Sequence, residues 1–407
     1  MRQARPYPAV QVSAKAERAI KQGHPWVYGE EIKSAAGEPA DGGLVDVFAG
    51  NAWLGTGFYN RHSKITVRLI SRNANDRFDA AFWARRVRYA LAYRRTVMGE
   101  DWSACRLIHG EADQMPGLTV DRYGDLFCAQ VLSLGMERVQ DLVFAALAEE
   151  MSALGAPVRG IFLRNDVSLR EREGLEQGKG WYPLPGRTPP ASAVTEITEN
   201  GVRYLVDLEN GQKTGFFLDQ KYNRRAAARL APGKRVLDCF THTGSFGLNA
   251  ARAGAERVLS VDISAGAIEM ARANAARNGL TNIDFQVADV FELLTALSRA
   301  HSHDFDYVIL DPPAFTKSRD TAAQAARGYK EINLRAMKLL PRGGYLATCS
   351  CSHFMPERDF RRMLRDAARD AGVALRQIEA RQQAPDHPIL WSVPETDYLK
   401  FYLFQVV

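Results

Sequence analysis

Two cysteines that lie two residues apart are the side chains of this sequence best suited to nucleophilic chemistry. Cys349 and Cys351 occur in the run Thr348–Ser352, at the end of an expected strand. A cysteine reaches its nucleophilic thiolate form near neutral pH, more readily beside cations or oriented backbone donors. Lys317 and His353 are candidates to give that help. Because a buried cysteine is more often a small apolar side chain, the surrounding sequence must decide between the two interpretations.

A carboxylate follows the preceding expected strand. The apolar run Tyr307–Leu310 ends in Asp311, and Pro312 and Pro313 come next. Each proline fixes φ and lacks a backbone donor, so the loop should hold the carboxylate rigidly. A rigid acceptor suits recognition of the planar edge of a base, whereas a plain strand-terminating turn is the alternative. If the two strands are neighbours, the thiols and this carboxylate face the same cleft.

The elements that must position these residues alternate regularly from about residue 233 onward. Strands are expected at Arg235–Asp238, Arg257–Asp262, Ile283–Val287, Tyr307–Leu310 and Gly344–Thr348. Helices are expected at Ser245–Arg252, Val290–Ala300 and Ala322–Leu340, and a further helix follows the second strand and ends at Arg277. Such alternation predicts an α/β domain with a parallel, doubly wound sheet. Ligands bind beyond the carboxyl ends of the strands in such sheets, so the residues that follow each strand are the candidates.

Three more aspartates stand at these positions. Asp238 precedes a glycine turn in which Gly244 and Ser245 open a helix, so that backbone N–H groups can approach a ligand. Asp262 can accept hydrogen bonds from both hydroxyls of a ribose, and Asp289 can receive an adenine amino group or simply cap a helix. Together they favour an adenosyl cofactor. The nicotinamide fingerprint GxGxxG and the triphosphate motif GxxxxGK[ST] are both missing.

The first half of the chain predicts two smaller domains. Residues 1–73 contain short β-type runs separated by Gly and Asn, which indicate a small β domain. Residues 74–190 have an α+β pattern, and a loop rich in Gly and Pro separates them from a third domain at 191–407. The α+β part begins with an arginine-rich helix from Asp79 to about Val97. Its arginines form either a solvated face or a phosphate-contacting face.

The composition restricts the setting without fixing the function. The net charge is +6, which is compatible with a polyanionic partner such as nucleic acid. We expect neither a membrane span nor a secretory signal, because no run of 18 apolar residues occurs and the N-terminus lacks an apolar core. Five scattered cysteines suggest neither a disulfide framework nor a metal site. A reduced, cytoplasmic setting fits.

Several separated motifs, in this order, resemble the bacterial 23S ribosomal RNA 5-methylcytosine methyltransferases over essentially the full length. They are Gly23–Tyr28, Gly117–Tyr123, Glu199–Gly201, Gln212–Gln220, Asp238–Gly247, Asp311–Phe315 and Thr348–Ser352. The resemblance implies an N-terminal PUA domain that binds RNA, a small central α+β domain, and a Rossmann-like class I domain that uses S-adenosylmethionine. It implies no metal.

The resemblance also assigns roles to individual residues. The cofactor would be surrounded by Gln220, Asp238, Phe240, Gly244, Ser245, Asp262, Ile263, Asp289 and Asp311. Asp311 would also hold the target base, and the nucleophile would lie in the stretch Ser350–Ser352, which favours Cys351. Because residues two apart in a strand face the same side, Cys349 stays a candidate. The expected reaction adds a thiolate to C6 of a flipped cytosine, so that C5 can take a methyl group.

Two other functions stay open at this point. The first is amino methylation of a base or a protein amide, in which an aromatic residue often follows Asp-Pro-Pro directly; here Ala314 intervenes. The second is a ribosome-assembly factor that binds RNA without catalysis, which would not require Asp262, Asp311 and Cys351 together. The sequence leaves open which nucleotide is modified, whether the substrate is free RNA or an assembled subunit, and whether the protein is a homodimer.

Overall fold

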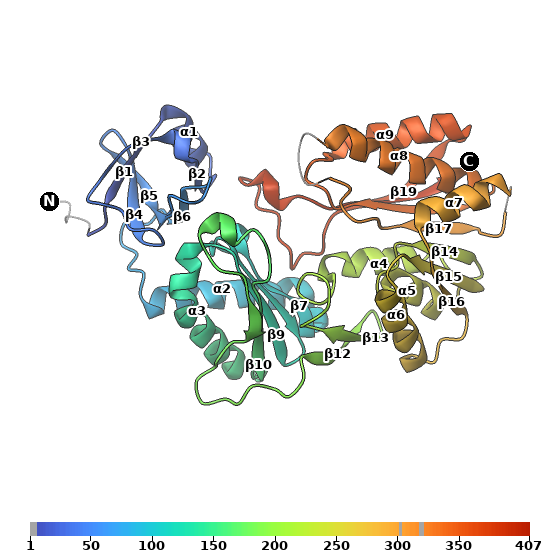
Figure 1. Ribbon diagram of the computed structural model, residues 1–407, viewed down its shortest axis with the longest axis horizontal. Coiled ribbons are helices and arrows are strands. Elements are labelled where there is room, and N and C mark those ends of the chain that lie inside the picture. Colours follow the sequence, from blue (N-terminus) through green and yellow to red (C-terminus); the bar gives the residue numbers. More distant parts are fainter. Residues whose placement is uncertain (1–5, 301–302, 317–320) are drawn as a thin grey trace. The chain divides into compact units, whose positions relative to one another are not determined.

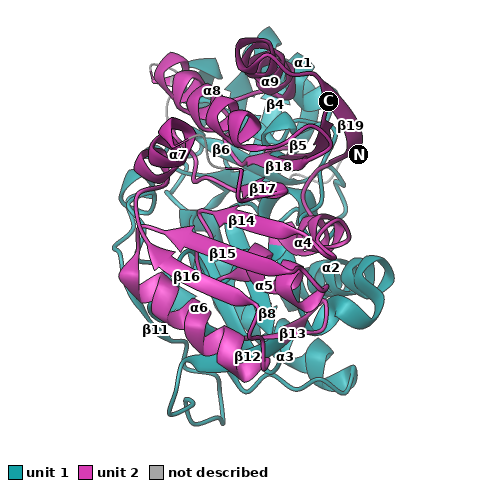
Figure 2. Cartoon of the chain, turned by 90° about the vertical axis from the view of Figure 1, so that its right-hand side faces the viewer, with its two compact units in different colours: residues 1–197, 206–218, 385–396 teal, residues 198–205, 219–384, 397–407 magenta. Residues whose placement is uncertain are grey.

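The computed structural model describes residues 6–300, 303–316 and 321–407 (Figure 1). The chain forms two compact units, shown in different colours in Figure 2. Unit 1 contains the described residues up to Ile197 together with Val206–Leu218 and Pro385–Thr396. Unit 2 contains Thr198–Leu205, Asp219–Ala384 and Asp397–Val407. The domain limits that the sequence suggested stay predictions.

Unit 1 begins with a six-stranded sheet in the order β2-β6-β5-β4-β1-β3. The strands are β1 Ala9–Val12, β2 Trp26–Val27, β3 Ile32–Ala36, β4 Leu44–Ala49, β5 Ala52–Tyr59 and β6 Val67–Ser71. Helix α1, Ala14–Lys21, starts at Ser13, whose side chain accepts a hydrogen bond from the backbone of Ala16. The alternating side chains of these strands bury a core that includes Val10, Val45 and Val67.

The second sheet of unit 1 has five strands in the order β11-β10-β9-β8-β7. They are β7 Ala104–His109, β8 Leu118–Tyr123, β9 Leu126–Val131, β10 Gly160–Arg164 and β11 Lys179–Trp181. Two long helices, α2 Ala80–Met98 and α3 Leu134–Ala153, pack against each other beside this sheet. Strands β8 and β9 form an antiparallel hairpin.

The arginines of α2 do not form one solvated face. Arg94 is fully buried: its guanidinium lies 2.5 Å from Asp113 and donates to the backbone oxygens of Arg106 and Asp386. For Arg94, the two interpretations made from sequence, a solvated face or a phosphate-contacting face, are therefore both wrong. In contrast, Arg88 is exposed and pairs with Glu150 at 2.7 Å.

These contacts fasten the segment Pro385–Thr396 to the rest of unit 1. The carboxylate of Asp386 is buried and accepts hydrogen bonds from the backbone N–H of Arg106, at 2.8 Å, and interacts with Nδ1 of His387 at 2.9 Å. The hydroxyl of Tyr93 donates to the backbone oxygen of Pro385 at 3.0 Å. Backbone and side-chain donors thus hold this segment from several sides.

Unit 2 is built on a seven-stranded sheet in the order β16-β15-β14-β17-β18-β20-β19. The strands are β14 Arg235–Cys239, β15 Arg257–Asp262, β16 Ile283–Val287, β17 Tyr307–Leu310, β18 Tyr345–Ser350, β19 Leu375–Arg381 and β20 Lys400–Val406. The first five are parallel, as the sequence predicts, whereas β20 runs antiparallel to both β18 and β19. Before them come β12 Val194–Glu199 and β13 Val202–Asp207, which form a two-stranded sheet.

Helices cover both faces of this sheet (Figure 2). They are α4 Lys221–Ala228, α5 Ser245–Arg252, α6 Ala265–Arg277, α7 Val290–Arg299, α8 Ala322–Leu339 and α9 Glu357–Ala371. On one face, α7, α8 and α9 bury Leu294, Ile332 and Leu364 against Leu237 and Leu346 of the sheet. This is the doubly wound α/β arrangement expected from the alternation of elements. Its carboxyl ends carry the candidate residues.

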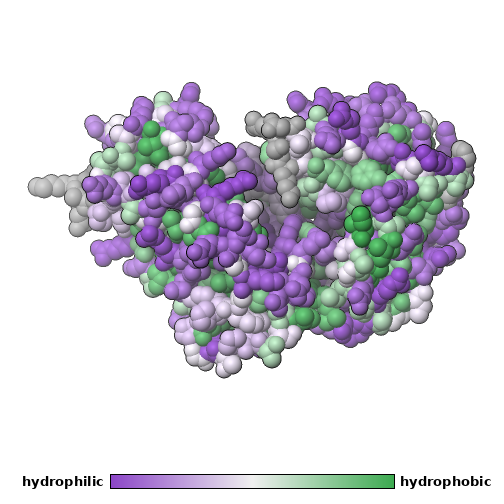
Figure 3. Space-filling model, in the orientation of Figure 1, coloured by the Kyte–Doolittle hydropathy of each residue, from purple (hydrophilic) through white to green (hydrophobic). Residues whose placement is uncertain are grey.

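Polar side chains cover most of the face shown in Figure 3, and apolar residues appear there in small patches. Among the described residues, no helix combines the length and apolar character needed to cross a lipid bilayer.

Replacing Arg94 by methionine should lower the free energy of unfolding by about 3–5 kcal/mol, because Asp113 would stay buried without its cation. Urea unfolding of the whole chain measures this difference. Arg88→Met, on the same helix, is the matched control and should leave the free energy of unfolding nearly unchanged. Equal losses in the two variants would contradict the role given to the buried pair.

Candidate functional site

The loop between β14 and α5 is held in a curled conformation by a buried carboxylate. Phe240, His242 and Gly244 all have positive φ, at 62°, 52° and 88°. Below the loop, Asp238 Oδ2 accepts hydrogen bonds from the Gly247 backbone at 2.8 Å and from the hydroxyls of Ser260 and Thr241. Burial raises the pKa of Asp238 to about 7. Asp238 therefore shapes the loop from beneath.

Gly247 is required by this arrangement. A Cβ atom at this position would lie 2.1 Å from Ser260 Oγ and 2.8 Å from Asp238 Oδ2. The close approach lets the Gly247 N–H reach the carboxylate, so the first turn of α5 can pack directly on the strand ends.

The next strand end combines a carboxylate with exposed apolar side chains. Asp262 accepts hydrogen bonds from the backbone N–H groups of His242 and Ser264, both at 2.9 Å. Ile263 is 70% exposed, and Val287, which is paired with Asp262 across β15 and β16, is 51% exposed. Large apolar groups exposed beside a carboxylate offer a surface for a planar ring that carries polar substituents.

Asp289 caps a helix. Its Oδ1 accepts hydrogen bonds from the backbone N–H groups of Phe291, at 2.7 Å, and Glu292, at 3.1 Å, at the start of α7. The capping alternative considered from sequence is thus present, and Oδ2 has no hydrogen-bond partner in the part of the chain that is described. The second oxygen stays available for a ligand.

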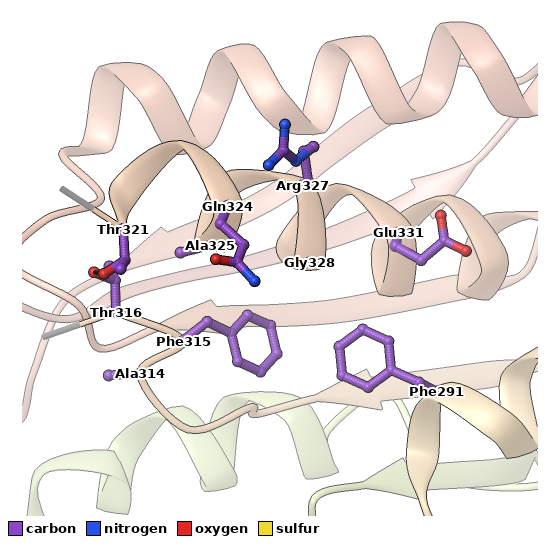
Figure 4. Close-up of a pocket in the computed structure, with 10 residues that line it drawn as sticks. All are labelled: Phe291, Ala314, Phe315, Thr316, Thr321, Gln324, Ala325, Arg327, Gly328 and Glu331. Atoms are coloured by element: carbon purple, nitrogen blue, oxygen red, sulfur yellow. Dashed lines mark hydrogen bonds between the residues drawn. The ribbon is translucent and has the colours of Figure 1, made fainter. Parts of the chain in front are cut away.

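Three phenylalanines come together next to these strand ends. The ring centroids of Phe240 and Phe291 are 6.4 Å apart, those of Phe240 and Phe315 are 6.4 Å apart, and those of Phe291 and Phe315 are 5.7 Å apart. A cavity of about 770 Å³ adjoins Phe291 and Phe315, with Gln324, Arg327 and Glu331 projecting from α8 (Figure 4). None of the site residues predicted from sequence lines this cavity.

The buried side chains of Gln220 and Cys349 form a hydrogen-bonded group with the partly buried Asp311. Gln220 Nε2 donates to Asp311 Oδ1 at 2.9 Å, and Asn223 Nδ2 donates to Gln220 Oε1 at 2.7 Å. The thiol of Cys349 hydrogen-bonds with Asp311 because β17 and β18 are parallel neighbours, with Leu310 opposite Thr348. A thiol thus lies beside this carboxylate, as expected from the sequence.

The charges around Asp311 set its proton affinity. Burial raises its pKa to about 6, and the nearby carboxylate of Asp219 acts in the same direction. The guanidinium of Arg224 and the hydrogen bonds from Cys349 and Gln220 act in the opposite direction. Asp311 is therefore mostly ionised at neutral pH and binds a proton when the pH falls through about 6.

Burial also raises the pKa of the Cys349 thiol well above its ordinary value, and the negative charge of Asp311 adds to this effect. Cys349 is 0% exposed. It is therefore held as a neutral thiol that donates a hydrogen bond.

Cys351 lies in a different environment. Strand β18 ends at Ser350, so Cys351 follows the strand, and the expectation that both cysteines share one strand face is wrong. The chain turns here because Ser352 accepts hydrogen bonds from the backbone N–H groups of Phe354 and Met355, both at 3.2 Å. Cys351 is half-buried rather than buried.

His353 and Lys317 were the residues expected to promote ionisation of the cysteine. His353 is exposed, and its ring lies 5.7 Å from that of Tyr398. Lys317 lies outside the described residues. A residue that was not predicted, Lys400, lies close to this turn: its ammonium donates to the backbone oxygen of Ser352 at 2.7 Å. No motif drew attention to it, because β20 was not predicted.

Two parts of the chain match known protein families. Residues 187–405 match the family described as S-adenosylmethionine-dependent methyltransferase, and residues 10–72 match the PUA-like domain. The chain belongs to the S-adenosylmethionine-dependent methyltransferases. S-adenosylmethionine is thus the cofactor, as predicted. Within the described ranges, no group of three His, Cys, Asp or Glu side chains is arranged to hold a metal ion.

Relatives within this family align over nearly the whole chain. Ribosomal RNA large subunit methyltransferase I of Shewanella denitrificans is 42% identical over 389 residues, which cover 94% of this chain and 96% of the relative. The Klebsiella pneumoniae protein of the same name is 37% identical and covers 98% and 99%. The chain therefore belongs to the ribosomal RNA large subunit methyltransferase I family.

Solved structures share the fold. A Streptococcus mutans chain assigned as an S-adenosylmethionine-dependent methyltransferase has a TM-score of 0.80 at 23% identity, and covers 98% of this chain and 100% of its own. A second methyltransferase, in complex with S-adenosylhomocysteine, has a TM-score of 0.82 at 22% identity. At these identities the likeness concerns the fold alone.

The glycine loop should be sensitive to a single methyl group. Gly247→Ala should weaken the binding of S-adenosylmethionine by about tenfold or more, because the loop must move away from Asp238 and Ser260. Isothermal titration calorimetry measures the affinity. Gly266→Ala, in α6, is the control, since its Cβ would meet no atom within 4 Å. Unchanged affinity in Gly247→Ala would show that the loop does not shape the cofactor site.

Proposed function

We propose that this protein methylates C5 of a cytosine in 23S ribosomal RNA, through a transient covalent bond between Cys351 and C6 of the base. The names of its relatives support a ribosomal RNA substrate, and the PUA-like domain supports RNA binding. The observation that carries the choice of C5 is the thiol of Cys349 hydrogen-bonded to Asp311, with a second thiol, Cys351, two residues further along the chain: an amino methyltransferase has no use for them.

The two cysteines suit different roles. Cys349 is fully buried beside a carboxylate, which disfavours the thiolate and favours a neutral donor that helps to orient Asp311. Cys351 stands just beyond the strand and is partly accessible. It is therefore the better nucleophile, and Cys349 is the alternative that the experiment below tests.

The residues at the strand ends fit an adenosyl ligand. Asp262 would accept the ribose hydroxyls, Ile263 would lie against the adenine ring, and the free oxygen of Asp289 would accept its amino group. The loop residues Phe240, Gly244 and Ser245 would lie against the amino-acid part, with Gln220 close to Asp311. Asp238 would act through the shape of the loop. When bound, S-adenosylmethionine supplies an electrophilic methyl group.

The chain's own residues would carry the remaining chemistry. The Cys351 thiolate adds its electron pair to C6, and the resulting ring is electron-rich at C5. Asp311 accepts a hydrogen bond from the exocyclic amine and stabilises a proton at N3 while charge builds up on the ring. Loss of the C5 proton and departure of the cysteine then restore the aromatic base. The target must be flipped or unpaired, at a cost of about a few kcal/mol.

Substitution of each cysteine tests the covalent step. Cys351→Ala should reduce methyl transfer by about 10³-fold or more, because the base cannot be activated without the nucleophile. Cys349→Ala should retain measurable activity. Tritium transfer from S-adenosylmethionine to 23S ribosomal RNA gives the rate, and mass spectrometry of the nucleosides gives the methylated atom. Full activity in Cys351→Ala, or a methyl group on an exocyclic amine, would refute the proposal.

The pH dependence tests Asp311. The ionised carboxylate is the acceptor, so kcat/KM should fall as the pH drops through about 6. Gln220→Leu removes a donor that stabilises the ionised form, which raises the pKa of Asp311 and should move this acid limb to higher pH. Gln377→Leu, at an exposed position of β19, is the control and should not move it. An acid limb that stays in place in Gln220→Leu would contradict the role of Asp311.

A further inference from the structure

Lys400 contacts the residues immediately before and after Cys351. It is the first residue of β20 and lies opposite Ser350, the residue before Cys351, in the antiparallel register with β18. Its ammonium donates to the backbone oxygen of Ser352, the residue after Cys351, at 2.7 Å. A second hydrogen bond goes to the backbone oxygen of Tyr398 at 2.8 Å. One lysine thus contacts both neighbours of the cysteine.

The positive charge of the Lys400 ammonium is buried and has no carboxylate close to it in the described part of the chain. Lys400 is 8% exposed, and among the described residues no carboxylate oxygen lies within 4.0 Å of its Nζ. An ammonium has three N–H donors, and the two carbonyl oxygens use two of them. The third donor has no acceptor in the described part of the chain. A buried cation without a counter-ion is costly, and this one therefore needs an anion nearby.

The surrounding charges leave Cys351 as the main candidate for that anion. Burial lowers the pKa of Lys400 to about 8, and the largest opposing influence is the negative charge of an ionised Cys351, ahead of Asp397 and Glu357. Both carboxylates have other partners: Asp397 accepts from Gln382 at 3.1 Å, and Glu357 accepts from the Tyr402 hydroxyl at 2.5 Å. Attraction between two charges is mutual, so the same ammonium stabilises negative charge on the sulfur of Cys351.

A cavity of about 370 Å³ gives access to this region. Its lining includes Lys400 itself, together with His353, Arg381, Gln382 and Asp397. Arg381 is occupied by Glu379 at 2.6 Å and by Asn223 at 3.0 Å. The cavity thus brings solvent to Lys400, next to the turn that contains Cys351.

We propose that Lys400 is a positioning residue for the nucleophile, which holds Cys351 as a thiolate and fixes the turn that presents it. The proposal rests on the proposed function for its role in catalysis. The thiol S–H bond breaks, its proton goes to water, and the electron pair that stays on sulfur forms the bond to C6. The same sheet thus provides opposite environments two residues apart: a carboxylate beside Cys349 and an ammonium beside Cys351.

The test measures the ionisation of the thiol directly, in the whole protein without RNA or cofactor. The rate of alkylation of Cys351 by iodoacetamide is followed against pH, and fragment ions in mass spectrometry separate Cys351 from Cys349. Lys400→Gln keeps N–H donors and loses the charge, whereas Lys400→Arg keeps both. We expect Lys400→Gln to raise the midpoint of alkylation by about one pH unit, with a rate about tenfold lower at pH 7. Lys400→Arg should keep the midpoint near that of the unchanged protein.

Equal midpoints in the unchanged protein and in Lys400→Gln would overturn the proposal, and so would a raised midpoint in Lys400→Arg. Urea unfolding of each variant establishes that it is folded at the pH values used. This outcome is separate from the proposed function, since alkylation needs neither RNA nor methyl transfer. If Cys351→Ala methylates RNA at full rate, the covalent mechanism is refuted. The effect of Lys400 on the thiol is still decided separately, by the alkylation midpoints of the Lys400 variants.

Discussion

A buried carboxylate must be given donors or it cannot stay ionised, and the centre of unit 2 is organised by that requirement. Asp311 follows β17, where it is partly buried, and receives hydrogen bonds from Gln220 and from the thiol of Cys349. The first donor comes from the start of α4, and the second comes from the neighbouring parallel strand. Neither element could shift without leaving the charge unsatisfied, so the need for donors fixes helix and strand relative to each other.

A second buried carboxylate, Asp238, repeats the principle on β14, the strand next to β17 in the sheet. Its donors come from the Gly247 backbone, Ser260 and Thr241, so it organises the loop between β14 and α5. The two carboxylates also influence one another, because the charge on Asp311 raises the pKa of Asp238 further. At neutral pH the negative charge lies mainly on Asp311, which would favour a cationic sulfonium cofactor nearby.

The sequence predicted the parallel part of this sheet well, because the periodicity of apolar residues is a local signal. Strands β15, β16 and β17 and helix α5 have the bounds that were expected, and β17 and β18 do lie side by side. The carboxylates after those strands could be named for the same reason. Their individual contacts could not: that Asp289 caps α7, and that Asp238 lies beneath its loop, depends on geometry that residue types alone do not fix.

Contacts between distant parts of the chain were beyond prediction. Lys400 comes 49 residues after Cys351 in the sequence, and only the antiparallel register of β20 brings it beside the turn. Arg94 is the extreme case, since the chain segment that accepts its hydrogen bond at Asp386 is 292 residues away. An arginine on a helix is usually solvated, and nothing in its neighbourhood along the sequence indicates a buried acceptor.

Residues 385–396 belong to unit 1 although the segments before and after them belong to unit 2, and this limits where the chain can be divided into fragments. The chain leaves unit 2 after Ala384 and re-enters it at Asp397, shortly before β20 takes its place between β18 and β19. A fragment that starts near residue 191 would retain Asp386 and His387 but lose the Arg94 and Arg106 groups that surround them. Such a fragment would expose a loop built for burial immediately before a central strand. The methyltransferase domain is thus compact by its contacts, but a fragment that contains it alone would lack the groups that bury Asp386 and His387.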